Sequence, residues 1–267
     1  MILTFIKIKK YRIKYLIIKK QKAFGRNNLG FITCRAKGGG IKRNLYKILD
    51  SNFANYGMSF SSAFYVNIIY DSFRRIFLAV YFIINSIIKN IYRYFLLTKN
   101  LKIGSQINFG FKAPLKIGNA LPLYKILLGS FIYNIEIRYK GKGSLVKNAN
   151  HNAIILMIGD IYVTVKLPSG EIKLLLKNLF CILGQLEIRR KVNKNIKKHA
   201  GFNRKLSIRP KIRGAAMNAV DHPHGGGEGK ASVGFKFART LWGKAFKGIK
   251  TRKKNKHLSR FILQHRL

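Results

Sequence analysis

The segment from residue 215 to residue 230 gathers the side chains that most often do chemistry. It reads AAMNAVDHPHGGGEGK and places Asp221, His222, His224 and Glu228 around three consecutive glycines. Imidazole and carboxylate groups at this spacing could hold a metal ion such as zinc. A glycine-rich run that ends in lysine also resembles a phosphate-binding loop. A third chemistry is RNA contact, because glycines without a Cβ let backbone N–H groups approach phosphate oxygens.

Both enzymatic interpretations of this loop lack a necessary feature. A phosphate loop of the form GxxxxGK[ST] would need glycine where His224 stands and a hydroxyl where Ala231 stands. A zinc hydrolase would need a rigid scaffold behind its ligands, whereas glycines and a charged tail flank these histidines. RNA contact requires no missing residue, so we favour it and expect no metal site and no catalysis. The alternative is a metal-assisted or nucleotide-dependent enzyme that uses the His222–Lys230 loop.

The charge of the chain points to a polyanionic partner. Lysine and arginine number 53 and aspartate and glutamate 8, which gives a formal net charge of +45 over 267 residues. Such self-repulsion destabilises a compact state unless a polyanion neutralises it. With 48% apolar residues the chain can nevertheless bury real cores, unlike a disordered polycation. We therefore expect folded domains that lie against nucleic acid or, as the lesser alternative, against an anionic membrane surface.

Four zones can be separated along the chain. Residues 1–22 are expected to form a basic arm along RNA, and residues 201–267 a basic tail that has no core and stays extended until RNA folds it. Residues 23–104 and 105–200 carry short β-branched and aromatic runs between turn signals, which predict two small β-barrels. The expected strands are Phe31–Arg35, Leu45–Leu49, Phe64–Tyr70, Ile76–Ile84, Ile91–Leu97, Leu115–Ile117, Gly129–Ile137, Ala153–Ile158, Tyr162–Lys166 and Glu171–Leu176.

Cysteine content, hydropathy and codon usage bear on the compartment. Cys34 and Cys181 lie far apart, which excludes a disulfide framework and a four-ligand zinc ribbon. The apolar run from Ile76 to Ile88 is shorter than the about 20 residues that a membrane helix needs, so we expect buried strands there and no membrane insertion. No transit peptide is evident. The abundant Ile, Lys, Asn, Phe and Tyr have codons rich in A and T, which favours a mitochondrial ribosome, with a plastid or the cytoplasm of an A/T-rich bacterium as alternatives.

Several short stretches of the chain carry a family resemblance. They are Gly25–Thr33 with Gly38–Gly40, Gly118–Pro122 with Gly141–Gly143, Met217–Lys230, and Trp242–Lys244 with Lys250–Lys256. In these stretches and in their order the chain resembles the ribosomal protein L2 family, the universal large-subunit proteins, in its bacterial or organellar form. The resemblance implies an all-β fold, in which an OB-fold barrel is followed by an SH3-like barrel, with extended basic N- and C-terminal tails.

The resemblance also implies a role in translation. Members of the family are structural constituents of the large ribosomal subunit that bind large-subunit rRNA near the peptidyl-transferase region and support subunit assembly and association. The implied partners are large-subunit rRNA, neighbouring ribosomal proteins and the small subunit across the intersubunit interface. We expect no cofactor other than Mg²⁺ that bridges to rRNA. His222 matches the family residue nearest the catalytic RNA, and we expect it to position RNA rather than to catalyse.

The resemblance and the basic surroundings together predict the RNA-binding residues. They are Arg26, Asn27, Asn28, Lys42, Arg43, Arg74, Arg75, Lys142, Lys147, Arg204, Arg209, Arg213, Asn218, His222, His224, Lys230, Trp242, Lys244, Lys250, Arg252, Lys253 and Lys254. Asn27 and Asn28 could equally cap their own turn. Lys147 stands where the family has an rRNA-contacting arginine. Lysine keeps the charge but loses the planar fork, so phosphate contact is expected there rather than base recognition.

Overall fold

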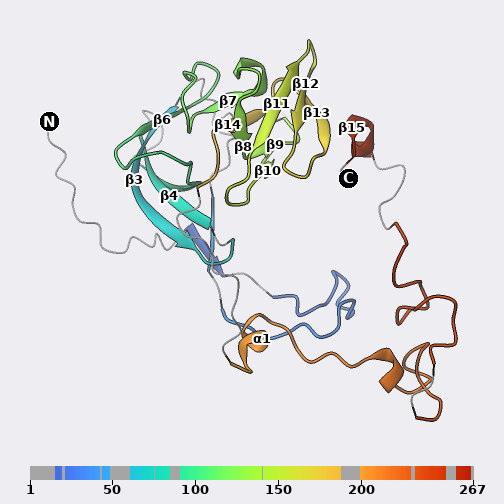
Figure 1. Ribbon diagram of the computed structural model, residues 1–267. Helices are drawn as coiled ribbons and strands as arrows, with labels where there is room; N and C mark the ends of the chain where they lie inside the picture. Colours follow the sequence, from blue (N-terminus) through green and yellow to red (C-terminus); the bar gives the residue numbers. More distant parts are fainter. Residues whose placement is uncertain are drawn as a thin grey trace. The chain divides into compact units, whose positions relative to one another are not determined.

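The part of the chain that the structure describes divides into two units (Figure 1). The computed structural model describes residues 16–19, 22–42, 44–48, 61–74, 76–84, 91–139, 141–187, 199–229, 232–250 and 257–265. The first unit comprises the described residues within Met1–Lys20, Arg43–Asn193 and Leu258–Leu267. The second unit comprises those within Gln21–Lys42 and Lys194–His257. No helix among all these residues is long and apolar enough to cross a bilayer.

The first half of the first unit is an antiparallel sheet. β3 (Ser61–Asp71) pairs with β4 (Ile76–Ile84) on one side and with β6 (Gln106–Phe109) on the other. β4 in turn pairs with β5 (Ile91–Leu96). β-branched and aromatic residues fill most positions of β4 and β5, and such side chains favour the extended backbone of a half-buried strand.

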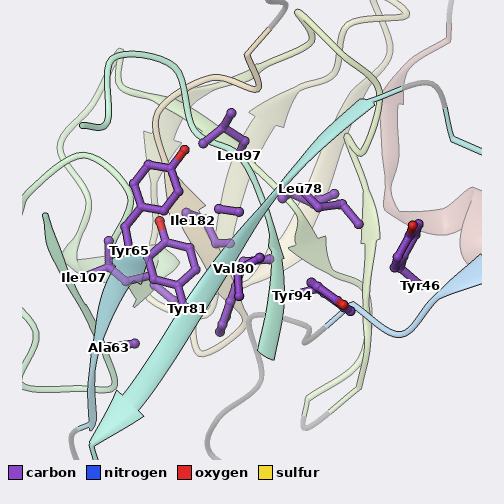
Figure 2. Close-up of a cluster of buried hydrophobic side chains, with 14 of the residues drawn as sticks. Tyr46, Ala63, Tyr65, Leu78, Val80, Tyr81, Tyr94, Leu97, Ile107 and Ile182 are labelled. Atoms are coloured by element: carbon purple, nitrogen blue, oxygen red, sulfur yellow. The ribbon is translucent and has the colours of Figure 1, made fainter. Parts of the chain in front are cut away.

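Aromatic rings build the first hydrophobic core against this sheet (Figure 2). Tyr81 packs edge-on against Phe95 with ring centroids 5.0 Å apart, and Phe95 stacks on Phe109 at 5.1 Å. Tyr65 lies beside Tyr81 at 5.4 Å. All four side chains are buried. Aromatic pairs of this kind contribute about 0.5–1.5 kcal/mol each beyond the burial of their area, so this half has a core of its own.

The sheet continues into a second half with a second core. In order across the sheet, its strands are β7 (Ala120–Pro122), β14 (Phe180–Leu183), β8 (Phe131–Tyr133), β11 (Ala153–Ile158), β12 (Tyr162–Lys166) and β13 (Ile172–Leu176). The two halves join where Phe109 of β6 pairs in parallel with Ala120 of β7. Aliphatic side chains such as Leu121, Ile155 and Val163 are fully buried in this second core.

Short strands complete the first unit. β1 (Ile17–Lys19) pairs with β2 (Asn44–Tyr46), and β9 (Ile135–Glu136) pairs with β10 (Gly143–Leu145). β15 (Ile262–Gln264), near the C-terminus, pairs with β13 and forms the outermost strand of the large sheet. The end of the basic tail therefore belongs to the first unit.

The all-β class and the longer strands were predicted correctly. The expected strands that coincide with β3, β4, β5, β11, β12 and β13 are Phe64–Tyr70, Ile76–Ile84, Ile91–Leu97, Ala153–Ile158, Tyr162–Lys166 and Glu171–Leu176. The expected strand Leu45–Leu49 overlaps only part of β2. The expected strand Gly129–Ile137 is divided into β8 and β9. The expectation did not include β1, β6, β7, β10, β14 or β15, because strands of three or four residues show too little alternation to be recognised.

Two expected strands are wrong. Leu115–Ile117 is a turn region in which Lys116 N–H donates to the Pro114 carbonyl, and Gly118 follows at a φ of +93°. This turn brings β7 alongside β6. Phe31–Arg35 is a loop in which only Ile32 makes a strand-like bridge, to Arg26. Its apolar residues have the composition of a strand but no neighbouring strand to join.

The second unit has little regular structure and no buried apolar side chain among its described residues. It contains α1 (Phe202–Lys205) and a short 3₁₀ helix over Gly214–Ala216. Residues 22–42 and the tail lie together in this unit, although the sequence assigned residues 23–42 to the first barrel zone. The described tail is thus partly folded on the chain itself rather than uniformly extended. The boundaries of the four zones stay a prediction.

Candidate nucleic-acid interface

The loop Met217–Gly229 is closed by its own backbone. Asp221 N–H donates to the Asn218 carbonyl over 3.0 Å, and Gly226 N–H donates to the Met217 carbonyl over 3.1 Å. Gly225 is required at this closure, because a Cβ there would lie 2.2 Å from the Asn218 carbonyl oxygen. Gly226 has a φ of +79°, a conformation that side-chain-bearing residues rarely adopt.

His222 is part of the internal framework of this loop. Its Nδ1 accepts a hydrogen bond from His224 N–H over 3.0 Å. The neutral ring therefore carries its proton on Nε2. The ring also packs directly on Gly214, where a Cβ would lie 2.4 Å from Cε1. The sequence suggested RNA contact for His222, and the structure adds that one ring nitrogen is used within the protein.

His224 ties the loop to the segment that follows it. Its Nε2 accepts a hydrogen bond from Arg239 N–H over 2.9 Å, and its ring lies 4.9 Å from that of His222. The guanidinium of Arg239 lies over the Phe235 ring at 4.0 Å from the centroid, a cation–π contact. No local sequence pattern marks Arg239, because its contact with His224 spans fifteen positions of glycine-rich chain.

The two histidines are poorly arranged for a metal. A metal ion would have to bind the ring nitrogens, and the Nδ1 of His222 and the Nε2 of His224 already accept backbone hydrogen bonds. In the described residues, no three His, Cys, Asp or Glu side chains gather into a group that could hold a metal ion. Asp221 and Glu228 are both exposed. These two ring nitrogens therefore serve the internal framework of the loop.

A small hairpin presents Trp242 to solvent. Arg239 and Ala245 bridge its arms, and Thr240 N–H donates to the Lys244 carbonyl over 2.7 Å. Gly243, at a φ of +74°, makes the turn next to Trp242, whose side chain is 62% exposed. Exposed rings beside cations suit stacking on unpaired bases. Phe237 and Phe246 are exposed in the same segment.

The loop near the start of the second unit is held by Gly25 and Asn27. Thr33 and Cys34 donate their N–H groups to the Gly25 carbonyl, each over 3.0 Å. The Oδ1 of Asn27 accepts hydrogen bonds from the N–H groups of Leu29 and Phe31 over 3.0 and 2.9 Å. Asn27 therefore caps its own turn, the alternative that the sequence left open. Arg26 and Asn28 stay exposed on the loop.

Backbone hydrogen bonds hold residues 36–41 and 203–209 together within the second unit. Gly38 N–H donates to the Ser207 carbonyl over 3.1 Å, and Arg209 N–H donates to the Ala36 carbonyl over 3.0 Å. The Nζ of Lys22 donates to the carbonyls of Gly39 and Gly40, each over 2.8 Å. Hydrogen bonds to the backbone rather than an apolar core thus hold this surface, and the side chains of Lys42, Arg204 and Arg209 stay exposed to a polyanion.

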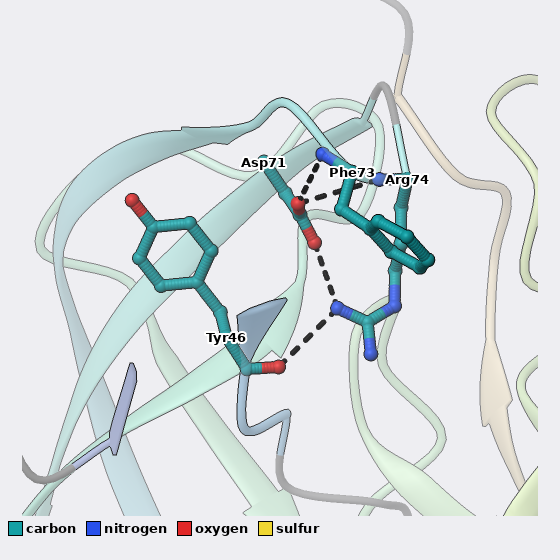
Figure 3. A network of polar contacts seen from close by, with 4 residues as sticks. All are labelled: Tyr46, Asp71, Phe73 and Arg74. Carbon is teal, nitrogen blue, oxygen red and sulfur yellow. Dashed lines mark hydrogen bonds and ion pairs between the residues drawn. The ribbon is translucent and has the colours of Figure 1, made fainter. Parts of the chain in front are cut away.

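In the first unit, Asp71 and Arg74 form a separate polar network (Figure 3). The buried Asp71 accepts hydrogen bonds at Oδ1 from the N–H groups of Phe73 and Arg74. Its Oδ2 pairs with NH1 of Arg74 over 2.7 Å, and the same nitrogen donates to the Tyr46 carbonyl over 3.2 Å. Arg74 was predicted to contact RNA, and this geometry commits one of its guanidinium nitrogens to the turn.

The other predicted RNA-binding residues are scattered over both units. Those exposed are Lys42, Lys142, Arg204, Arg209, Arg213, Asn218, Lys244 and Lys250, whereas Lys147 is half-buried. Arg43, Arg75, Lys230, Arg252, Lys253 and Lys254 lie outside the described residues. Both units therefore present exposed cations, and many separate cations suit contact with a long phosphate backbone.

Comparisons with known proteins give one consistent answer. The family model for Ribosomal Proteins L2, RNA binding N-terminal domain, matches residues 13–108. The model for Ribosomal Proteins L2, C-terminal domain, matches residues 116–243. The large ribosomal subunit protein uL2c of Eimeria tenella is 43% identical over 258 residues, which cover 91% of this chain and 93% of that protein. The matched region includes both cores, the Met217–Gly229 loop and Trp242.

Proposed function

The chain belongs to the ribosomal protein L2 family, and from this premise we propose that its second unit anchors it in large-subunit rRNA near the peptidyl-transferase region. As a member of the family it is a structural protein of the large ribosomal subunit that binds rRNA. An OB-fold and an SH3-like barrel account for the two cores of the first unit. The family assignment also favours a structural rather than an enzymatic role.

One observation carries the proposal for the second unit. Its described residues bury no apolar side chain, yet its loops follow defined paths that backbone hydrogen bonds and glycines set. Such a surface has no core to stabilise it against the mutual repulsion of its cations. Phosphate groups would remove that repulsion and order the loops, and the exposed Trp242 would stack on a base.

We assign His222 and His224 positioning roles. Each ring accepts a backbone hydrogen bond that fixes the loop around Gly225, so each can set the path of the backbone without taking part in proton transfer. The remaining Nε2–H of His222 and the N–H groups of the glycines can donate to phosphate oxygens. Replacing His222 by Ala in assembled large subunits tests this role. We expect weaker assembly with unchanged peptide transfer per assembled subunit, and normal assembly with much slower transfer would contradict it.

The proposal also covers contacts across the subunit interface and the compartment of the ribosome. The positive charge and the exposed loops of the chain are suited to both subunit assembly and subunit association. An organellar ribosome is the setting that the relative supports, since uL2c of Eimeria tenella is of the plastid type. We therefore propose a plastid ribosome in preference to the mitochondrial one that codon usage suggested. Co-sedimentation of the tagged chain with large subunits from purified plastids is expected, and its recovery in mitochondrial ribosomes alone would overturn the assignment.

A further inference from the structure

A hollow of about 260 Å³ lies on the second half of the first unit, and its lining includes none of the RNA-binding residues named above. It is lined by Tyr139, Asp160, Ile161, Leu176, Lys177 and Leu179, among others. Two turns form most of it, the one between β11 and β12 and the one between β13 and β14. Lys177 N–H donates to the Ile161 carbonyl over 3.1 Å, which holds these turns side by side. The hollow is therefore part of the folded barrel.

The walls of the hollow are apolar and open to solvent. Ile161 is 62% exposed, Tyr139 50% and Leu176 42%, and Leu179 forms a buried floor. The volume lies below the range of about 300–1,000 Å³ typical of small-molecule sites. A single long side chain is the ligand of matching size.

The carboxylate in the hollow favours a cationic ligand. Asp160 is exposed, whereas the other described acids of the first unit, Asp71, Glu136, Glu171 and Glu187, are buried or half-buried. The described residues supply no ion pair to Asp160. A phosphate oxygen would be repelled by this carboxylate. A cation, by contrast, would find a carboxylate and an aromatic ring in the same hollow.

We propose that the hollow receives one Lys or Arg side chain from an extended segment of a neighbouring large-subunit protein. The aliphatic stem would pack on Ile161 and Leu176, as long basic side chains do on apolar surfaces. The charged end would lie between Asp160 and Tyr139. Lys177 also lines the hollow, so the incoming charged end is placed toward Asp160 rather than toward Lys177. The inference rests on the proposed function, because the partner is a protein of the same subunit.

Site-directed photo-cross-linking in assembled large subunits tests the inference. The probe is Ile161→p-benzoylphenylalanine in the full chain, with the cross-linked peptides identified by mass spectrometry. We expect a cross-link to a protein segment that carries Lys or Arg. Adding Asp160→Lys should lower the cross-link yield by about fivefold or more, because it repels the cation. The matched control Glu171→Lys makes the same charge change on the same barrel, outside the hollow, and should leave the yield unchanged.

Other outcomes overturn the inference. The inference fails if the probe cross-links to rRNA, if it cross-links to a protein segment without Lys or Arg, or if no cross-link forms. It also fails if Asp160→Lys leaves the cross-link yield unchanged. Binding of the purified chain to large-subunit rRNA separates this failure from that of the proposed function. Asp160→Lys should leave that affinity within about twofold of the parent chain. If the parent chain does not bind rRNA at all, the proposed function fails as well.

Discussion

Single side chains hold several turns and loops of this protein by accepting backbone hydrogen bonds. Asp71 is the clearest case, because its carboxylate receives two backbone N–H groups and the guanidinium of Arg74 (Figure 3). Replacing such a buried carboxylate by a neutral group costs stability, because the N–H groups around it are left without an acceptor. Arg74 thus stabilises the turn after β3 before it contacts any RNA.

We expect Asp71→Asn to lower the free energy of unfolding by about 1–3 kcal/mol, because an amide presents an N–H to donors that need an acceptor. The midpoint of urea unfolding of the full chain measures this loss. Asp160→Asn makes the same change at an exposed carboxylate and should stay within about 0.5 kcal/mol. Equal losses for the two variants would show that the Asp71 network contributes nothing specific.

Substitution of Gly225 tests the path of the Met217–Gly229 loop. We expect Gly225→Ala to weaken rRNA binding by about tenfold, because the added Cβ collides with the Asn218 carbonyl and the loop must open. Equilibrium filter binding measures the affinity. Gly201→Ala is the matched control, since only His199 lies near its Cβ, at 3.7 Å. An affinity for Gly225→Ala equal to that of the control would mean that the closed loop is not the RNA-binding form.

At the scale of elements, the sequence predicted long strands and missed tertiary pairing. β4 could be predicted because nine consecutive residues are apolar and mostly β-branched or aromatic. Phe31 and Ile32 have the same composition but are 68% and 53% exposed, so the same residue types do not form a strand where no sheet buries them. The contact between His224 and Arg239 depends on a turn whose path no local pattern encodes.

β15 illustrates how such pairing adds stability at an edge. We expect a chain that ends after Lys256, and so lacks β15, to lose about 1–2 kcal/mol and to self-associate, because the edge of β13 is uncovered. Urea unfolding and sedimentation velocity measure the two effects. Leu263→Lys changes a side chain that is 61% exposed in β15 and should preserve the pairing. A monomeric truncated chain of full stability would contradict this role of β15.

The buried tyrosines of the first core predict that the free energy of unfolding falls at alkaline pH. Burial raises the pKa of the Tyr81 hydroxyl far above its ordinary value, with Tyr133 and Tyr65 adding to the effect. Above about pH 10 the unfolded chain loses a proton there that the folded chain keeps, so stability falls by up to about 1.4 kcal/mol per pH unit. Tyr81→Phe should make this fall shallower, as urea midpoints between about pH 9 and 11 would record. An unchanged slope, equal to that of the exposed-site control Tyr70→Phe, would refute the assignment.

At the scale of the whole molecule, the two units differ in what holds them together. The first unit buries two cores and can fold by hydrophobic packing. The second unit gathers basic residues on loops that bury no apolar side chain among those described. The net charge of +45 predicted a polyanionic partner for the chain, but composition alone could not reveal that residues 22–42 fold with the tail. That arrangement arises from contacts between segments far apart in the sequence.

The salt dependence of binding to large-subunit rRNA tests the central claim most directly. Equilibrium affinity of the full chain would be measured from about 50 to 300 mM salt, with duplex DNA and anionic vesicles as competitors. Each phosphate contact lowers log K by about 0.7–0.9 per unit of log salt, so the many exposed cations predict a slope of about −5 or steeper. We also expect rRNA to be preferred over both competitors by at least about tenfold. A flat salt dependence, or equal affinity for rRNA, DNA and vesicles, would contradict the account.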